Sequence, residues 1–332
     1  MAEYKGVMAF CEATEGKLAS ISTELLGGGR KLADDLGQEL SAVLVGSGIS
    51  SLAQEAIFFG ADKAYIVDDP LLKDYQTDSY VLVMEKVVNQ ATPQILIMGQ
   101  TSIGRDLAPR LAFRLNTAAS LGCLELAIDP GSKLLLQTKP VYGGNAQAAF
   151  VCQTYPQIAT VRAKAMTPLE RDKSRQGEVI TIKAGLDPSA IRTKVVEKVL
   201  EKVEGIRLQD AQVIVGGGRG IGSAEGFKQL EELARMLKGA VGATRPPCDN
   251  GWAPGGAQIG LTGKIVTPEL YIAVALSGSS QHMSGCSGSK TIVAINKDPE
   301  ANIFREARFG VVGDWKKVLP AFTNKLKELL AE

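Results

Sequence analysis

The chain has 332 residues, with 37 Lys and Arg against 36 Asp and Glu. Single hydrophobic cores stop growing at roughly 250–300 residues, so this length predicts two domains. The balanced charge creates no field that would gather nucleic acid or an anionic membrane surface, which argues against a nucleic-acid role. No apolar stretch approaches the ~20 residues that cross a bilayer, so we expect a protein that does not span the membrane.

Cysteine usage and the amino terminus indicate the compartment. The five cysteines are odd in number, far apart and without a CxxC pair, which argues against bound zinc and against a thioredoxin-like couple. Such thiols are typical of a reducing compartment. The apolar run 6–11 follows the start of the chain almost at once and leaves no room for a signal or transit peptide. We therefore expect a cytoplasmic protein without a metal site.

The first half of the chain alternates short β-branched runs with longer amphipathic segments. Strands are expected at 7–11, 42–45, 64–67 and 95–98, and helices at 18–32, 51–59, 80–88 and 103–115. Strands joined through helices run parallel with right-handed crossovers, so this pattern predicts an open parallel sheet covered on both faces. Three glycines at 27–29 lie inside the first helix and indicate either a break or close packing.

The middle of the chain is less regular. Runs at 134–138, 150–153 and 158–161 have no helix between them, and we expect them to be antiparallel additions. The segment 167–210 is charged and weakly periodic, and within it 191–203 fits either a helix or an extended strand. We place the domain boundary near Gly205, which gives domains 1–205 and 206–332.

A second alternation of strands and helices follows the boundary. A buried-strand run at 213–215 leads into a glycine-rich turn at 216–222, and a helical face continues to Leu237. Further strands at 270–274 and 291–295 and a closing amphipathic helix at 318–329 complete the pattern. The fold class is therefore α/β, with two doubly wound parallel-sheet domains.

The glycine-rich turn supports two interpretations. A strand, a glycine turn and a helix bring free backbone N–H groups to one spot, where a phosphate can sit. The turn is not a strict GxGxxG because Ile221 stands at the third glycine position, and Gln258 rules out a P-loop ending at Lys264. A tight connection is equally expected, although Arg219 inside the turn favours an anion. Turns at 46–48 and 99–104 in the first domain are better explained as ordinary connections.

A more specific set of motifs follows. They are Thr244-Arg-Pro-Pro-Cys-Asp-Asn-Gly-Trp252, Gln258-Ile-Gly-Leu-Thr-Gly-Lys264, Leu270-Tyr-Ile-Ala273, Leu276-Ser-Gly-Ser-Ser-Gln-His282, Ile292-Val-Ala-Ile-Asn-Lys-Asp298 and Gly310-Val-Val-Gly-Asp314. In order and spacing this set resembles the α subunit of electron transfer flavoprotein. The first half fits that family's first domain in length and pattern. The resemblance implies that the second domain binds FAD.

The resemblance assigns three residues to the flavin ring. Arg245 would lie against the ring, where a fixed cation favours its reduced, negatively charged forms, and Thr244 before it keeps a hydroxyl. Thr262 would hydrogen-bond the N5 edge. His282, the only histidine, would lie near the pyrimidine carbonyl, although a lone histidine is more often a satisfied structural residue.

Further residues are implied to surround the rest of FAD. Small and polar residues would serve the pyrophosphate and ribityl region, namely Ser277, Gly278, Ser279, Ser280, Gln281 and Asn296. Asp314 would accept from ribose hydroxyls at the adenosine end, with Trp315 beside it, and Ile259, Gly260 and Leu261 would precede the N5 threonine. The family usually has glutamine at the position of Leu261, so one polar contact to the flavin is expected to be missing or made by backbone.

The implied function is electron transport. The subunit would accept electrons through FAD from acyl-CoA dehydrogenase-type donors, as in fatty acid oxidation, and pass them to a quinone reductase or another acceptor oxidoreductase. A β subunit would complete the heterodimer by packing on the first domain. No residue is expected to be catalytic in the acid–base sense, since the cofactor carries the chemistry. The electron-bifurcating branch stays open, because the resemblance places a second nucleotide site mainly in the partner.

Two other functions remain as alternatives. One is a structural or regulatory nucleotide-binding subunit, in which the C-terminal glycines are only turns. The other is a flavin dehydrogenase that acts on its own substrate. Such an enzyme needs a carboxylate facing the ring to abstract a proton, and the motifs contain no Glu or Asp in that role.

Overall fold

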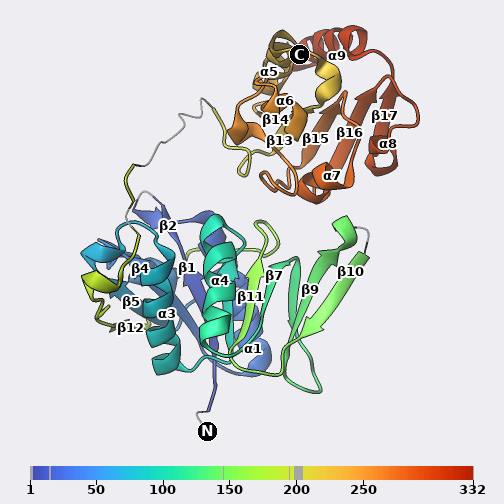
Figure 1. The fold of residues 1–332 in the computed structure, drawn as a ribbon. Coiled ribbons are helices and arrows are strands. Elements are labelled where there is room, and N and C mark those ends of the chain that lie inside the picture. Colours follow the sequence, from blue (N-terminus) through green and yellow to red (C-terminus); the bar gives the residue numbers. More distant parts are fainter. Residues whose placement is uncertain (1–2, 15, 145, 194, 198–204, 332) are drawn as a thin grey trace. The chain divides into compact units, whose positions relative to one another are not determined.

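A computed structural model describes residues 3–14, 16–144, 146–193, 195–197 and 205–331. The chain divides into two compact units, one of Met1–Val141 with Gln147–Lys198 and the other of Tyr142–Ala146 with Val199–Glu332 (Figure 1). The predicted boundary near Gly205 adjoins residues outside the described ranges and stays a prediction. The segment 191–203 also lies partly outside them, and its described residues form neither helix nor strand.

The first unit is built on a seven-stranded sheet in the order β12-β5-β4-β1-β6-β11-β7. Its strands are β1 (Val7–Cys11), β4 (Leu40–Gly46), β5 (Lys63–Asp68), β6 (Ile95–Gly99), β7 (Ala119–Cys123), β11 (Gln157–Val161) and β12 (Glu178–Thr181). Every pairing between neighbours is parallel. The predicted open parallel sheet is therefore confirmed.

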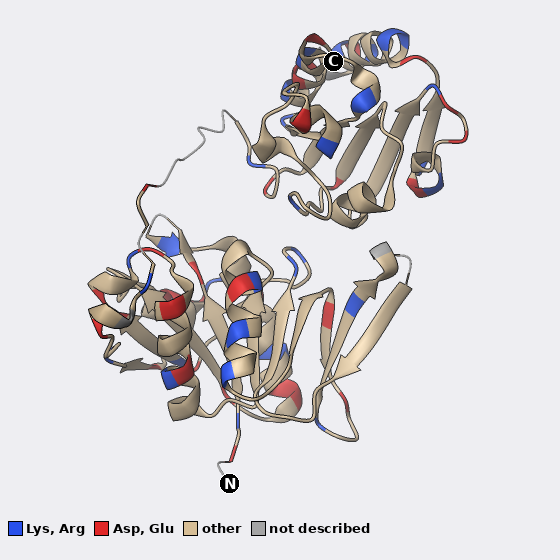
Figure 2. Ribbon diagram, viewed as in Figure 1, with Lys and Arg blue, Asp and Glu red and all other residues tan. Residues whose placement is uncertain are grey.

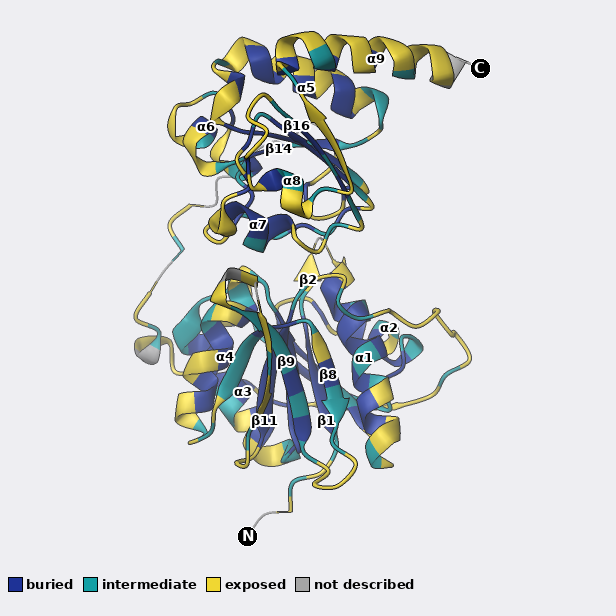
Figure 3. Cartoon of the chain, turned by 90° about the vertical axis from the view of Figure 1, so that its right-hand side faces the viewer, coloured by how far each residue is buried: buried dark blue, intermediate teal, exposed yellow. Residues whose placement is uncertain are grey.

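Helices cover both faces of this sheet. They are α1 (Ser20–Leu36), α2 (Leu52–Phe58), α3 (Thr77–Ala91) and α4 (Ser102–Arg114). Successive side chains of β1 point to opposite faces, so Ala9 joins the core beneath α1 and α2, whereas Phe10 joins the core beneath α3 and α4. Buried residues concentrate in the strands and on the inner faces of the helices (Figure 3). Shorter elements are β2 (Ala13–Thr14), β3 (Lys17–Leu18), η1 (Pro70–Leu72) and η3 (Pro188–Ala190).

The expected antiparallel additions are right in one part and wrong in another. β8 (Glu125–Ile128), β9 (Leu135–Val141) and β10 (Ala146–Val151) form a separate three-stranded sheet in which β8 and β9 are antiparallel. The run 158–161 instead belongs to β11, which is parallel to both β6 and β7. All five residues of β11 are buried, as in an interior parallel strand. The connection from β7 to β11 passes through the three-stranded sheet and η2 (Tyr142–Gly144) and contains no helix. Because a helix between two strands is the usual sign of parallel pairing, the sequence pattern wrongly predicted an antiparallel strand at 158–161.

The three glycines in α1 mark close packing and not a break. The helix runs without interruption from Ser20 to Leu36. A Cβ at Gly27 would lie 2.1 Å from the carbonyl oxygen of Thr167, and one at Gly28 would lie 2.0 Å from the sulfur of Met166. The glycines therefore let the segment that follows β11 lie directly against the helix.

The second unit has a five-stranded parallel sheet in the order β14-β13-β15-β16-β17. Its elements are β13 (Val213–Gly217), η4 (Arg219–Ile221), α5 (Ala224–Met236), β14 (Ala240–Ala243), α6 (Arg245–Asp249), η5 (Gly255–Ala257), β15 (Leu270–Val274), α7 (Ser280–Cys286), β16 (Thr291–Asn296), α8 (Ile303–Glu306), β17 (Phe309–Val312) and α9 (Trp315–Ala331). Two cores lie on its two faces. This is the second doubly wound domain, and its strand order reverses between β13 and β15.

Charged side chains of both signs are interspersed over the helices and loops of each unit, and the central strands carry few of them (Figure 2). This distribution agrees with the absence of a one-signed field predicted from composition. Among the described residues, no helix combines the length and the apolar character needed to cross a membrane.

Candidate functional site

The predicted cofactor residues follow the carboxyl ends of all five strands in the second unit. Arg219 comes after β13, Thr244 directly follows β14, Ser277 comes after β15, Asn296 ends β16 and Asp314 comes after β17. Because parallel strands all point the same way, these ends lie along one edge of the sheet (Figure 1). Ligands of open α/β sheets bind at this edge, near the point where strand order reverses.

The glycine-rich turn lies at that point of reversal, between β13 and β15. The N–H of Gly218 donates to the carbonyl of Val274 at 3.0 Å, and the N–H of Gly220 donates to that of Ala275 at 3.2 Å. A Cβ at Gly218 would lie 2.3 Å from the Ala275 oxygen. These two N–H groups therefore bond the neighbouring strand, and the glycines serve a close approach of two loops. The turn is a tight connection, and the side chain of Arg219 is exposed beside it.

Arg245 begins the short helix α6 after β14. The N–H of Thr244 donates to the carbonyl of Gly217 at 3.0 Å, which fixes the start of this segment. The Arg245 side chain is 68% exposed, and its Nε lies 3.1 Å from Oδ2 of Asp249. An exposed pair of this kind leaves most of the guanidinium free to contact a ligand.

The loop 259–262 is held between β14 and α7. The N–H of Ile259 donates to the carbonyl of Ala243 at 2.9 Å, and that of Leu261 donates to the carbonyl of Gln281 at 2.7 Å. Gly260 has a φ of +144°, and a Cβ there would lie 2.8 Å from the same Gln281 oxygen. This anchoring leaves the Leu261 side chain 61% exposed at the surface.

Thr262, the last residue of this loop, is also exposed. Its hydroxyl oxygen accepts a hydrogen bond from Nε2 of Gln258 at 2.9 Å. The hydroxyl proton of Thr262 is therefore available to a further acceptor.

His282 is buried in α7, with 4% of its surface exposed. Its Nδ1 lies 3.0 Å from the carbonyl oxygen of Ile259, and its Nε2 lies 2.9 Å from the hydroxyl of Tyr271. A carbonyl only accepts, so Nδ1 carries the proton, and Nε2 accepts from the tyrosine. Burial lowers the pKa of His282 to about 4, so the ring is neutral near pH 7.

This arrangement gives His282 two partners within the chain. Both ring nitrogens are satisfied, and neither has a hydrogen left for a flavin carbonyl. The predicted contact to the pyrimidine carbonyl would require the ring to exchange one of these partners, and it stays a prediction. The motifs did not predict this role for Tyr271. A tyrosine inside the otherwise apolar strand β15 was the signal for a buried hydroxyl that needs a partner.

The segment after β15 presents small polar side chains. Ser277, Ser279, Ser280 and Gln281 are exposed, whereas Gly278 is buried. Gly278 has a φ of +74°, and a Cβ there would lie 2.4 Å from the backbone nitrogen of Ile303. The segment ends at the start of α7, where the first N–H groups have no partner within the helix.

Asn296 and Trp315 hold the loops of this edge together. Nδ2 of Asn296 donates to the carbonyl of Leu276 at 2.8 Å, and its Oδ1 accepts from the N–H of Asp298 at 3.0 Å. Trp315 is 6% exposed, and its Nε1 donates to the carbonyl of Gly220 at 3.0 Å. Both side chains therefore support the walls of the edge.

Asp314 caps α9 at the last strand of the edge. Its Oδ1 accepts from the N–H of Lys316 at 3.0 Å. The residue is exposed, so its second carboxylate oxygen is accessible to a further donor.

At the turn after β4 in the first unit, a carboxylate of the chain itself occupies the backbone donors. Asp68 accepts from the N–H groups of Gly48, Ile49 and Ser50 at 2.7–3.1 Å and from the Ser50 hydroxyl at 2.6 Å. These bonds, that of the Ser50 hydroxyl first, lower the pKa of Asp68. The donors that a phosphate would need at this turn therefore already have an acceptor.

A second carboxylate, that of Glu12, lies at the turn after β6. Glu12 accepts from the hydroxyl of Thr101 at 2.6 Å, and Thr101 in turn caps α4 through the N–H of Gly104 at 3.0 Å. Burial raises the pKa of Glu12. The turn after β6 is thus held by internal hydrogen bonds, as expected for an ordinary connection.

Taken together, the second unit is a nucleotide-binding type of domain, an open doubly wound sheet with its polar residues gathered at one edge. No group of His, Cys, Asp or Glu that would hold a metal ion occurs among the residues that the structure describes.

Comparison with known proteins identifies the family. Residues 7–187 match the electron transfer flavoprotein domain, and residues 207–287 match the electron transfer flavoprotein FAD-binding domain. The chain is 45% identical over 330 residues to the electron transfer flavoprotein subunit alpha of Thermoanaerobacterium thermosaccharolyticum, covering 99% of this chain and 100% of the relative. The subunit alpha of Megasphaera elsdenii is 45% identical over 331 residues, with 99% and 98% covered. That of Bacillus subtilis is 42% identical over 326 residues, with 98% of each covered.

The chain belongs to the electron transfer flavoprotein alpha-subunit family, and its cofactor is FAD. The residues at the edge fit this group. Exposed hydroxyls beside the start of α7 suit the phosphates, while the exposed Arg245 and Leu261 offer a cation and an apolar surface to a flavin ring. The role in electron transfer predicted from the motifs is thereby confirmed.

Proposed function

We propose that this chain forms a heterodimer with a β subunit and carries electrons from acyl-CoA dehydrogenase-type donors to an acceptor oxidoreductase, such as a quinone reductase. The observation that carries the site assignment is the position of predicted cofactor residues after all five strands of the FAD-binding domain. Bound FAD supplies the redox chemistry, and the chain supplies orientation and electrostatics.

Each part of the edge would hold a different part of the cofactor. Arg245 would place a positive charge against the flavin ring, and the free hydroxyl proton of Thr262 would reach the N5 edge. The serines at 277, 279 and 280, with Gln281, would contact the pyrophosphate and ribityl chain. Asp314 would accept from the adenosine ribose with its accessible oxygen.

Several of the proposed residues would hold the loops of the site in position rather than contact FAD. The side-chain hydrogen bonds of Asn296 and Trp315 hold the loops after β15 and β13 in place. Ile259 and Gly260 fix the loop that carries Leu261, and Gly278 permits the close turn before α7. Thr244 and Arg219 flank the ends of β14 and β13, and Arg219 is free for an anionic group.

The names of relatives support the proposed partners. Relatives are named as alpha subunits, which makes those proteins parts of larger assemblies. A protein of Anaerotignum propionicum that is 36% identical to this chain is named acryloyl-CoA reductase electron transfer subunit beta. That name associates it with the chemistry of acyl-CoA thioesters. A cytoplasmic location is supported by five cysteines that form no disulfide.

Two measurements test this proposal. The chain purified with its co-expressed partner should show visible flavin absorption that bleaches when a catalytic amount of an acyl-CoA dehydrogenase and its thioester substrate are added. A complex without flavin bands after incubation with FAD would favour the alternative of a structural nucleotide-binding subunit. Bleaching by a small organic substrate without any dehydrogenase would favour the alternative of an autonomous enzyme.

A further inference from the structure

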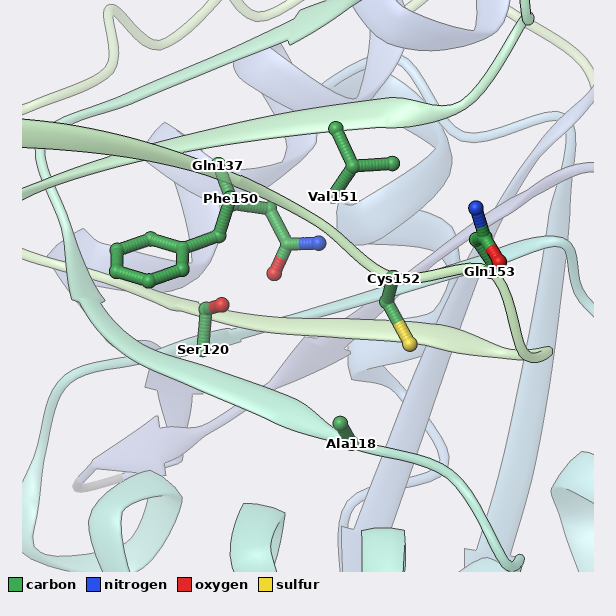
Figure 4. A pocket seen from close by; sticks show the side chains of 7 residues that line it. All are labelled: Ala118, Ser120, Gln137, Phe150, Val151, Cys152 and Gln153. Atoms are coloured by element: carbon green, nitrogen blue, oxygen red, sulfur yellow. The ribbon is translucent and has the colours of Figure 1, made fainter.

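A cavity of about 390 Å³ lies in the first unit. It is bounded by β7, β9, the end of β10 and the segment that follows β10 (Figure 4). Its walls include the Ser120 hydroxyl, the Phe150 ring, the Gln137 carboxamide and the Cys152 thiol. A space of this size falls within the range of small-molecule sites.

Gln137 supplies a polar group without a partner. The residue is 1% exposed, and its Oε1 has no hydrogen-bond partner among the residues that the structure describes. Its Nε2 lies 3.5 Å from the carbonyl of Leu135. A buried carbonyl oxygen without a donor is costly, so this atom marks a place for a ligand N–H or O–H. Figure 4 shows the carboxamide turned toward Ser120 and Cys152.

Cys152 supplies a nucleophile to the same cavity. Its sulfur lies 3.1 Å from the hydroxyl oxygen of Thr154 and 3.7 Å from that of Thr117. Although partial burial opposes it, these hydrogen bonds and those from the backbone of Thr154 and Ala118 lower the pKa of the thiol. The thiolate is the reactive form of cysteine, so this side chain is suited to attack an electrophilic sulfur.

The other four cysteines form an internal contrast. Burial raises the pKa of Cys11 and Cys286 to about 12 and that of Cys123 to about 11. Cys248 is half-buried like Cys152, yet burial and the neighbouring Asp249 raise its pKa. Selective reaction at one thiol is therefore expected from the local surroundings.

A cation also lies beside the cavity. The Nζ of Lys139 lies 5.3 Å from the ring centroid of Phe150, whose ring lines the cavity. Lys139 and Gln137 stand two residues apart on β9, so they share a face of the strand. A ligand that fits this cavity would donate an N–H to Gln137 and place a carboxylate near Lys139. A small acidic peptide carries both groups.

We propose that this cavity binds a small acidic peptide disulfide, which modifies Cys152 by thiol–disulfide exchange. The Cys152 thiolate attacks one sulfur of the disulfide, and a new bond between that sulfur and Cys152 forms as the original S–S bond breaks. The other half leaves as a thiolate and takes a proton from water. The Cys152 sulfur is oxidised, the leaving sulfur is reduced, and no other oxidant is needed.

The test uses the purified FAD-containing protein with its co-purifying subunit. It is incubated with glutathione disulfide, a small acidic peptide disulfide, and the modified cysteine is identified by peptide mass mapping under non-reducing conditions. We expect one addition, at Cys152, which Cys152→Ser abolishes and Cys248→Ser leaves unchanged. Addition at Cys248 at a comparable rate, or no addition at Cys152, would overturn the proposal.

Recognition is separated from reactivity by a second reagent. Methyl methanethiosulfonate also reacts with thiolates, but it is small and has no N–H or O–H donor. Gln137→Leu, which removes the unpaired acceptor, should slow the reaction with glutathione disulfide about tenfold and leave the reaction with methyl methanethiosulfonate unchanged. Equal effects on both reagents would overturn the proposal, because they would mean that the cavity does not recognise the peptide. Ser120→Ala provides a smaller change in the same wall and should slow only the peptide disulfide.

Discussion

The burial of His282 makes the stability of the FAD-binding domain depend on pH. In the folded domain this ring takes up a proton only as the pH falls to its pKa of about 4, whereas in the unfolded chain it does so near pH 6.5. Between these values the unfolded state holds more protons, so stability falls as the pH is lowered through this window and is flat above about pH 7. At about 1.4 kcal/mol for each pH unit, the whole window corresponds to about 3 kcal/mol.

Urea unfolding of the wild type and of His282→Gln measures this effect. Glutamine can donate to the Ile259 carbonyl and accept from Tyr271 in the same way, but it does not titrate. Tryptophan fluorescence reports the second domain alone, because both tryptophans, Trp252 and Trp315, belong to it. We expect the free-energy difference between the two proteins to shift by about 2 kcal/mol in favour of the variant between pH 7 and pH 5. A difference that does not change with pH would refute the buried neutral ring.

A direct readout of the same ring comes from nitrogen NMR of the chain labelled at histidine. The chain has a single histidine, so the signal needs no assignment. We expect the tautomer with the proton on Nδ1 throughout the range from pH 5 to pH 8. A proton on Nε2 would contradict the hydrogen bonds to Ile259 and Tyr271.

Three further predictions concern single substitutions. Gly218→Ala places a Cβ 2.3 Å from the Ala275 oxygen, so it should destabilise the second domain by about 1–3 kcal/mol in urea and lower its FAD content; normal values would show that the loops yield easily. Arg245→Ala should make the potential of bound FAD more negative by about 40 mV per electron, since an exposed cation at ~4 Å contributes about 1 kcal/mol; an unchanged potential would place the guanidinium away from the ring. Asp68→Asn should destabilise the first unit by about 1 kcal/mol near pH 7, as followed by circular dichroism, and by less near pH 3. The folded protein holds the pKa of Asp68 below its usual value, so the stability that the ionised carboxylate contributes is lost when acid protonates it. A destabilisation by Asp68→Asn that is the same at pH 7 and pH 3 would contradict this prediction.

Local patterns predicted most of the fold, and they failed where a distant partner decides the structure. The helix and strand periods located β1 and α1 within a few residues, because burial of one face acts along the chain itself. The edge strand β12 was missed because its residues are mostly exposed and only its pairing with β5 makes it a strand. The parallel β11 was misread because its neighbours β6 and β7 are far away in sequence.

The site shows the same division. The motif spacing predicted which loops carry polar side chains, and the strands β15 and β16 before two of these loops were also predicted, whereas β14 and β17 were not. It did not predict that the ring nitrogens of His282 are both engaged, because that depends on where Tyr271 and the Ile259 carbonyl meet in space. The glycine turn was likewise ambiguous, since only the position of Ala275 shows where the N–H of Gly220 points.

The carboxylate of Asp68 has a consequence for anion binding at the turn that follows β4. A phosphate arriving at this turn would have to displace an acceptor that is tethered to the same polypeptide and never diffuses away. Such a tether keeps the competing group at an effective concentration in the millimolar range or above. The turn after β4 is thus closed to a phosphate group by competition within the molecule.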